Sequence, residues 1–293
     1  KRTTMSWRII VIRSRAKLSY KNNYMIVRGD DIGMIHLSEI HTLLIDTTAV
    51  TISSFLLCEL MKKKVKIIFC DEKRNPVGEL IPYYGSHNCS KKIQMQVNWD
   101  EKAKKLVWTE IIKQKIKNQM NLLSKYKKIG FLKLEKYIQE IEFFDRTNRE
   151  GHAAKVYFNS LFGMNFSREI ECDINAALDY GYSIILSTFN KEIVSNGYIT
   201  TLGIKHINEF NQFNLTSDLM EPFRVIVDEC VYENIGSSFD QEYKLELVGL
   251  LNKKITFNGK EHILVNAIPI YVKSVFNAIE KMNINELVLF EYI

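Results

Sequence analysis

The spacing of hydrophobic positions changes part of the way along the chain. Up to about residue 84, short runs rich in β-branched and aromatic residues alternate with turn residues, which indicates strands. The runs are Trp7 to Ile12, Leu18 to Tyr20, Tyr24 to Val27, Met34 to Leu37, Thr42 to Ile45, Val65 to Phe69 and Glu79 to Pro82. Turns are expected at Lys21-Asn22-Asn23 and at Arg28-Gly29-Asp30-Asp31, and Val50 to Lys63 has helical spacing.

Beyond residue 91 the hydrophobic positions recur with the period of long helices. Helices are expected over Lys91 to Lys128, with lysine-rich outer faces, and over Phe131 to Phe144, Asp145 to Phe162, Cys172 to Ser195, Thr216 to Tyr232 and Ile268 to Met282. We expect the Cys172 to Ser195 helix to be central and buried, and the Thr216 to Tyr232 helix to begin close to Asp218. Asn258-Gly259 predicts a hairpin within Ile255 to Val265. The chain is therefore an α+β protein, with a β-rich domain over residues 1–90 and a mainly helical domain over residues 91–293.

Composition excludes several classes of protein. The 293 residues are 46% hydrophobic, enough for one large or two ordinary cores. The five cysteines show no Cys-x-x-Cys pair, so neither a zinc site nor a disulfide framework is expected. No apolar run reaches the length of a membrane span, and we expect a soluble, cytoplasmic protein. The net charge of +6 permits a nucleic-acid partner without requiring one, and Lys1 to Thr4 precede Met5, which we take as the natural start.

Three residues offer a possible metal-ligand set. Glu150 lies in the first turn of an expected helix, His206 in a polar stretch from Thr200 to Asn214, and Glu221 near the start of a later helix. Two carboxylates and one imidazole suit Mn²⁺ or Mg²⁺, with positions left for water or phosphate oxygens. Such a site is assembled from distant segments, so the spacing alone does not identify it.

Each of these residues also has an ordinary structural interpretation. Asp218-x-x-Glu221 has the form of a capping box at a helix start. Glu150 can pair with Arg146 or Arg149, and His206 can be a hydrogen-bonded loop histidine. The residues alone leave both interpretations open.

Four segments resemble a known family. They are Arg149-Glu150-Gly151-His152-Ala153-Ala154-Lys155-Val156-Tyr157-Phe158, Asp179-Tyr180-Gly181-Tyr182, Leu202-Gly203-Ile204-Lys205-His206 and Phe213-Asn214-Leu215-Thr216-Ser217-Asp218-Leu219-Met220-Glu221-Pro222-Phe223-Arg224. In this order they resemble the CRISPR adaptation integrase, the first CRISPR-associated protein, over nearly the whole chain. The sequence around Asp145-Arg146-Thr147-Asn148 is most similar to that of family members that accompany type II systems.

The resemblance implies a fold, a site and an activity. It implies an N-terminal β-sandwich and a helical catalytic domain in which Glu150, His206 and Glu221 bind Mg²⁺ or Mn²⁺. Asp218 would then either contact one of these metal ligands or face the DNA. The reaction implied is integration of captured DNA fragments into the CRISPR repeat by transesterification, and Arg146, Arg149, Lys155 and Lys205 are candidates for holding phosphates of the DNA.

Partners follow from the same resemblance. It implies a homodimer, assembled through the β-rich domain, and a small ferredoxin-fold adaptation subunit that bridges two dimers around double-stranded DNA, both the captured fragment and the repeat. Two other functions remain open at this stage. One is a purely hydrolytic metal-dependent DNase, and the other is a non-catalytic DNA-binding scaffold whose acids serve as helix caps.

Overall fold

The computed structural model describes residues 8–82 and 86–293 and divides the chain into two compact units. The first unit is Lys1–Gly85 and the second is Ser86–Ile293, so the second begins slightly earlier than the sequence pattern indicates. Within the described ranges, no helix combines the length and the apolar character needed to cross a bilayer.

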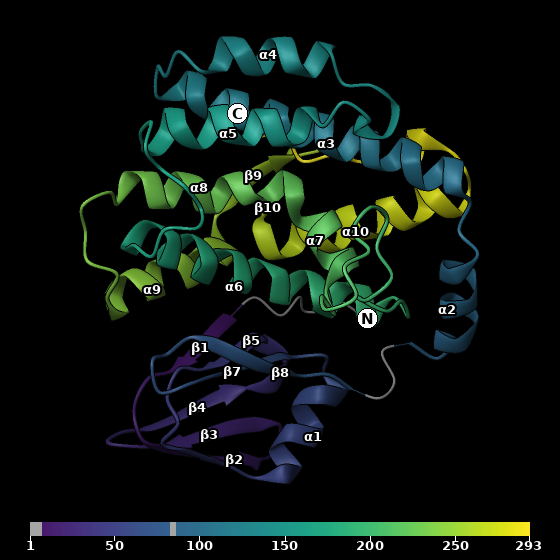
Figure 1. The fold of residues 1–293 in the computed structure, drawn as a ribbon. Coiled ribbons are helices and arrows are strands. Elements are labelled where there is room, and N and C mark those ends of the chain that lie inside the picture. Colours follow the sequence, from purple (N-terminus) through teal and green to yellow (C-terminus); the bar gives the residue numbers. More distant parts are fainter. Residues whose placement is uncertain (1–7, 83–85) are drawn as a thin grey trace. The chain divides into compact units, whose positions relative to one another are not determined.

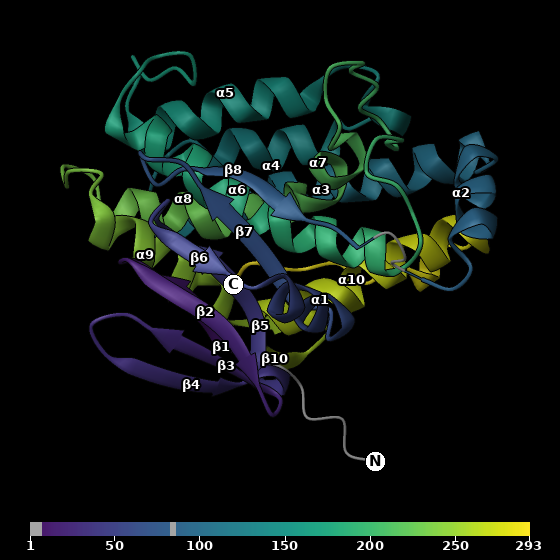
Figure 2. The same cartoon turned by 90° about the horizontal axis from the view of Figure 1, so that it is seen from below.

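The first unit consists of two four-stranded sheets and one α-helix (Figures 1 and 2). One sheet has the order β1 (Arg8–Ile12), β5 (Ile40–Ile45), β7 (Lys66–Cys70), β8 (Pro76–Leu80); the first three strands are parallel and β8 is antiparallel to β7. The other has the order β4 (Ile32–His36), β3 (Tyr24–Arg28), β2 (Ala16–Lys21), β6 (Val50–Ile52), with β6 parallel to β2. The remaining elements are η1 (Leu37–Glu39) and α1 (Ser54–Lys62).

A shared hydrophobic core joins both sheets and α1. It includes the fully buried Leu18 of β2, Leu43 of β5 and Leu56 of α1. Burying one such side chain contributes about 1.5–3 kcal/mol relative to leaving it exposed. All six residues of β5 are buried, as expected for a strand with neighbours on both edges and cover on both faces. The expected β-sandwich with one helix is therefore confirmed.

The segment from residue 50 to residue 53 departs from the prediction of a helix. Val50–Ile52 is a strand paired with β2, and α1 begins only after Ser53, whose hydroxyl accepts a hydrogen bond from the Leu56 backbone N–H. The β-branched residues of Val50–Ile52 favour the strand, although their spacing also fits a helix. The predicted hairpin turn is confirmed, because Asn22 and Asn23 both have positive φ between β2 and β3.

The second unit is mainly helical, as predicted. Its elements are α2 (Cys89–Val97), α3 (Glu101–Lys125), α4 (Phe131–Gln139), η2 (Phe143–Asp145), α5 (Arg149–Phe162), α6 (Asp173–Ser195), α7 (Asn214–Met220), η3 (Glu221–Phe223), α8 (Arg224–Glu233), α9 (Gln241–Gly249), η4 (Leu250–Asn252), β9 (Lys254–Phe257), β10 (Lys260–Ile263), α10 (Leu264–Glu280) and η5 (Ile284–Glu286). The β9–β10 hairpin at Asn258-Gly259 is confirmed.

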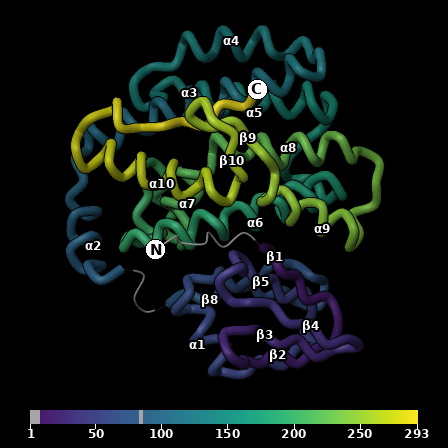
Figure 3. Tube along the Cα trace, turned by 180° about the vertical axis from the view of Figure 1, so that it is seen from behind, coloured from purple at the N-terminus to yellow at the C-terminus, as the bar shows by residue number. Residues whose placement is uncertain are grey.

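Two long helices organise this unit. α6 contacts α7, α8, α9 and α10, which confirms its predicted central position, and α3 contacts α4, α5, α8 and α10. α4 lies on the outer side of α3 and α5 (Figure 1). The chain after α10 runs back along α3 (Figure 3), where Asn118 donates hydrogen bonds to the carbonyls of Phe290 and Pro222 and accepts one from the Tyr292 N–H.

Several helix boundaries differ from the prediction. α7 begins at Asn214 rather than near Asp218, and Pro222 lies in η3, the 3₁₀ turn that separates α7 from α8. A proline has no N–H to donate, so it fits where the regular hydrogen bonds of a helix are interrupted. α10 begins at Leu264, with Pro269 still near its start. α9 is a further helix that the pattern did not indicate.

Gly181 allows α6 to approach its neighbours closely. A Cβ at this position would lie 2.5 Å from Val227 Cγ1 and 3.2 Å from Leu247 Cδ2. We expect Gly181→Ala to lower the free energy of unfolding by about 1–3 kcal/mol, because the overpacking outweighs the better helix propensity of alanine. Gly249→Ala is the control, since Gly249 also lies in a helix but has open space around it. Denaturant titration measures both, and equal effects would contradict close packing at Gly181.

Candidate active site

The start of α5 is held by backbone contacts that place Glu150. Phe144, Asp145 and Asn148 all have positive φ, so the chain turns sharply before the helix. The buried Asp145 carboxylate accepts hydrogen bonds from the backbone N–H groups of Arg149 (2.7 Å) and Glu150 (3.0 Å). These are N–H groups that a helix start leaves without partners. Asp145 therefore precedes the helix and binds its first N–H groups, together with the N-cap residue Asn148, whose side chain accepts the Gly151 N–H. The expected range of Asp145 to Phe162 began too early, although a capping polar residue before the helix was expected.

Lys115 of α3 joins the carboxylates of Glu150 and Glu221. Its Nζ lies 2.7 Å from Glu150 Oε1 and 2.6 Å from Glu221 Oε2. Burial lowers the pKa of Lys115, but the two carboxylates outweigh burial and the pKa is raised overall. Glu150 thus pairs with neither Arg146 nor Arg149, the partners suggested by the sequence.

Arg224 supplies a second cation to Glu221. Its Nε lies 3.0 Å from Glu221 Oε1, and its guanidinium lies over the ring of Tyr182 at 4.7 Å. Burial would raise the pKa of Glu221, but Arg224 and Lys115 overcome it and lower the pKa to about 2. Glu221 is therefore a carboxylate at all ordinary pH values, although only 5% of it is exposed.

His206 is oriented by Asp218. The His206 Nδ1 lies 2.5 Å from Asp218 Oδ1, and the same carboxylate accepts the backbone N–H groups of Ile204 (2.6 Å) and Lys205 (2.9 Å). The hydrogen bond to Asp218 raises the pKa of His206 against the opposing effect of burial. Asp218 is fully buried, so the interpretations of Asp218 as a helix cap or as a residue that faces DNA are wrong.

Gly203 permits this close arrangement. A Cβ on Gly203 would lie 2.4 Å from the His206 carbonyl oxygen and 2.7 Å from Asp218 Oδ2, distances that no side chain tolerates. The loop can fold tightly around the Asp218 carboxylate only because position 203 has no side chain.

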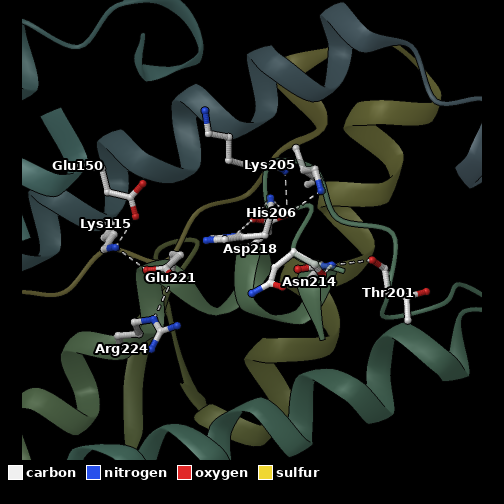
Figure 4. Close-up of polar contacts among 11 residues, drawn as sticks. Lys115, Glu150, Thr201, Lys205, His206, Asn214, Asp218, Glu221 and Arg224 are labelled. Atoms are coloured by element: carbon white, nitrogen blue, oxygen red, sulfur yellow. Dashed lines mark hydrogen bonds and ion pairs between the residues drawn. The ribbon is translucent and has the colours of Figure 1, made fainter. Parts of the chain in front are cut away.

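The structure brings the three predicted metal ligands, Glu150, His206 and Glu221, together only in part (Figure 4). Glu150 and Glu221 contact the same ammonium, while His206 lies beside them, near enough that both carboxylates add to its raised pKa. As the side chains stand, no group of three acidic, histidine or cysteine residues within the described ranges could hold a metal ion. The metal assignment of Glu150, His206 and Glu221 stays a prediction.

The chemistry of these side chains fits a divalent ion. Glu221 Oε2 is buried and receives no hydrogen bond from the described residues, although it lies in the ion pair with Lys115. The contact between Asp218 and His206 Nδ1 leaves the other ring nitrogen, Nε2, as a donor to a metal, an arrangement common in metalloproteins. Two carboxylates and an imidazole are ligands that Mn²⁺ accepts, and Mg²⁺ accepts the carboxylates readily.

A cavity of about 680 Å³ opens beside His206. It is lined by polar residues of the loop between α6 and α7, among them Asn208 and Asn214, and by the exposed side chains of Ile207 and Phe210. Asn214, the first residue of α7, donates hydrogen bonds to the carbonyls of Thr201 and Asn208, so it holds two separate points of this loop. The prediction of a loop at a site is consistent with this geometry.

The predicted phosphate-binding residues differ in their surroundings. Arg146 and Lys155 are exposed and form no ion pair within the described part of the chain. Arg149 pairs with Glu140 at 3.1 Å, so its charge already has an internal partner. These surroundings favour Arg146 and Lys155 over Arg149 as groups available to DNA.

Lys205 has an aromatic neighbour. Its ammonium lies 3.9 Å from the centre of the Phe144 ring, and the Lys105 ammonium lies 5.5 Å from the same ring. The ammonium groups of Lys205 and Lys105 therefore both lie close to Phe144, the residue before Asp145. The long helix α3 carries many lysines, as predicted. Several of them pair with nearby acids, so part of its positive charge is neutralised within the chain.

Sequence reasoning missed Lys115 and Arg224 as parts of the site. Lys115 lies three residues after Ile112 and next to Ile116, on the face of α3 that the hydrophobic period marks as buried. A lysine at a buried position requires an acidic partner, and this signal was available. Arg224 lies one helical turn after Glu221, a spacing that favours an ion pair.

Comparisons with known proteins identify the family. The family model described as CRISPR associated protein Cas1 matches residues 9–245. The CRISPR-associated endonuclease Cas1 of Neisseria meningitidis serogroup C (strain 8013) is 29% identical over 292 residues, which cover 97% of this chain and 96% of that protein.

Solved structures show the same fold. A casposase bound to an integration product superposes with a TM-score of 0.75 at 17% identity, covering 98% of this chain and 93% of that one. A chain of a Cas6-RT-Cas1–Cas2 complex superposes with a TM-score of 0.73 at 18% identity; the match covers 99% of this chain but only 36% of that longer polypeptide. The family-model match extends over most of the chain, and this chain belongs to the Cas1 family of CRISPR-associated proteins.

Proposed function

We propose that this chain is the integrase of CRISPR spacer acquisition, joining the 3′-hydroxyl ends of captured double-stranded DNA to the CRISPR repeat. The observation that carries the proposal is the convergence of Glu150 and Glu221 on one cation, next to the His206–Asp218 pair. These residues come from segments far apart in the sequence, and structural capping or pairing does not require all of them at one place. The resemblance to type II adaptation proteins is part of the proposal.

The proposed reaction is a transesterification. The 3′-oxygen of the fragment forms a bond to phosphorus at the repeat boundary, the bond from phosphorus to the repeat's 3′-oxygen breaks, and the proton of the attacking hydroxyl passes through solvent to the leaving oxygen. Glu150, Glu221 and His206 would hold Mg²⁺ or Mn²⁺. When bound, the ion lowers the pKa of the attacking hydroxyl and offsets negative charge on the non-bridging oxygens.

The surrounding residues position this centre. Asp218 fixes the ring of His206 through Nδ1, and Arg224 holds one oxygen of Glu221, leaving the other oxygen toward Lys115. The cavity beside His206 gives a strand of DNA room to approach. Because its substrates would be cellular DNA, we expect the protein to act in the cytoplasm.

The proposal includes an assembly. Joining both ends of one fragment requires two active sites at a fixed separation, which a single chain does not provide. We therefore propose homodimers, each formed through the first unit, with a small ferredoxin-fold adaptation subunit that bridges two of them. A complex that contains both Cas1 and Cas2 among the structures of similar fold supports this proposal.

The first test removes a proposed ligand without changing its size. We expect Glu221→Gln to reduce joining of a labelled fragment to a repeat-bearing plasmid by about 100-fold or more. Mutating a residue that only hydrogen-bonds a metal ligand already lowers metal affinity or activity by about 10–100-fold, and Glu221 would itself be a ligand. Glu229→Gln is the matched control, because Glu229 is equally buried, pairs with Lys125 and Lys253, and lies outside the site. Circular dichroism checks that both variants fold.

The same assay separates the alternatives. Cutting of DNA without covalent joining supports a hydrolytic DNase. If the wild type binds DNA but neither joins nor cuts it, and Glu221→Gln binds DNA equally well with only a loss of stability, the acid has a structural role and the chain is a scaffold.

The second test concerns the metal. We expect an excess of chelator to stop joining and either Mn²⁺ or Mg²⁺ to restore it, while Ca²⁺ restores little because it accepts a looser and larger coordination shell. Gel analysis of the joined product measures the effect. Full activity in chelator contradicts the proposed metal site.

The third test concerns the DNA-contacting surface. DNA affinity should fall steeply as salt rises, because phosphate contacts release counterions. We expect Arg146→Ala and Lys155→Ala each to reduce the slope of log K against log salt by about 1. Lys281→Ala, which removes an exposed lysine paired with Glu286, should leave the slope unchanged. Fluorescence anisotropy measures the slope, and identical slopes in all variants would remove Arg146 and Lys155 from the interface.

A further inference from the structure

Lys115 occupies the position between the two acids of the site. Its Nζ contacts one oxygen of Glu150 and one oxygen of Glu221, both within 2.7 Å (Figure 4). The remaining oxygen of Glu221 is already bound by Arg224. A divalent ion held by both acids would therefore compete with the ammonium for Glu221 Oε2.

The charges around this point are balanced. Glu150 and Glu221 contribute two negative charges, and Lys115 and Arg224 contribute two positive charges. A divalent ion would add two positive charges beside the buried Glu221 and Lys115, where uncompensated charge is costly. Either a cation must leave the acids, or negative groups such as DNA phosphates must arrive.

The two cations differ in how easily they can move. The Arg224 guanidinium is fixed by the ion pair through Nε and by the face of Tyr182. Lys115 carries its charge on a flexible four-carbon chain, and its two carboxylate contacts are the only polar contacts of its Nζ within the described ranges. Lys115 is therefore the cation that can give way.

We infer that Lys115 is an internal counter-cation, which holds Glu150 and Glu221 together in the metal-free protein and leaves them when a divalent ion and DNA phosphate enter. This inference rests on the proposed function. It makes metal binding and DNA binding mutually dependent, because the displaced ammonium and the added metal charge are both neutralised by phosphate. Lys115 is a positioning residue in this scheme, and it acts through the acids.

A purely structural lysine predicts the opposite effect on metal affinity. If Lys115 only kept the two acids in place, its removal would scatter them and weaken metal binding. If Lys115 competes with the metal for the same oxygens, its removal strengthens metal binding. The direction of the change therefore distinguishes the two roles.

The experiment measures Mn²⁺ binding by calorimetry on the full chain, with Lys115→Met as the test variant. Methionine keeps most of the length of the side chain without its charge. Lys113→Met is the control, because Lys113 lies on the same helix but pairs with Glu110 at the surface. Each protein is titrated alone and with a short duplex that ends in 3′-dideoxynucleotides, so that no joining occurs.

We expect Lys115→Met to bind Mn²⁺ at least tenfold more tightly than the wild type in the absence of DNA, and to gain less affinity when DNA is added. In chelator it should melt at a lower temperature than the wild type, since the buried Glu221 and the partly buried Glu150 lose a cation. Saturating Mn²⁺ should raise its melting temperature more than that of the wild type. Lys113→Met should match the wild type. Lys115→Gln tests the same direction if the methionine variant does not fold.

Two results would overturn the inference, and only the second would also overturn the proposed function. Equal or weaker Mn²⁺ binding by the Lys115 variants, with clear binding by the wild type, removes the counter-cation role and leaves the proposed function intact. Failure of every protein to bind Mn²⁺, with or without DNA, removes the proposed metal-dependent function as well.

Discussion

The contact of one buried ammonium with two carboxylates, one buried and one partly buried, is the constraint on which the site depends. Lys115, Glu150 and Glu221 come from α3, α5 and η3, which are far apart in the sequence. Each charge alone would be costly in the interior, and together they are neutralised. The packing of α5 against α3, and of η3 against α3, therefore has an electrostatic requirement in addition to the hydrophobic one.

The residues of the site lie where regular helix stops. Glu150 follows a turn with positive φ values, Glu221 begins a 3₁₀ turn before Pro222, and His206 lies in a loop that closes around the Asp218 carboxylate. At such places backbone N–H groups lack helical partners, so buried carboxylates can accept them. Departures from regular structure thus supply both the orientation of the acids and the hydrogen bonds that hold them.

Much of the architecture could be predicted from the spacing of hydrophobic residues. The strands of the sandwich, the long helices and the Asn258-Gly259 hairpin follow from periodicity and turn chemistry, which are local properties. The boundaries at Val50 and Asn214 were misjudged because the residues there fit two patterns, and tertiary pairing decided between them. Local sequence contains no such information.

The candidate site was less accessible to sequence reasoning. The three proposed ligands could be grouped from the sequence, and only the resemblance favoured a metal site over capping and pairing. The cations that balance them were overlooked. Lys115 is one of many lysines on a long helix, so it resembles an exposed surface residue unless its position on the buried face of that helix is considered. The partner of Asp218 could not be deduced either, since His206 approaches it through a loop whose path depends on the absence of a side chain at Gly203.

The side-chain amide of Asn118 uses its full capacity of two donors and two acceptors. It binds the carbonyls of Pro222 and Phe290, the N–H of Tyr292 and the amide of Gln114. One residue thereby fastens the final segment of the chain to the helix that carries the central lysine and to the turn that carries an acid. Chain ends commonly fray before the rest of a protein opens. Here the tail shares one amide with the turn that carries Glu221, so local opening of the tail also removes part of the support of that turn.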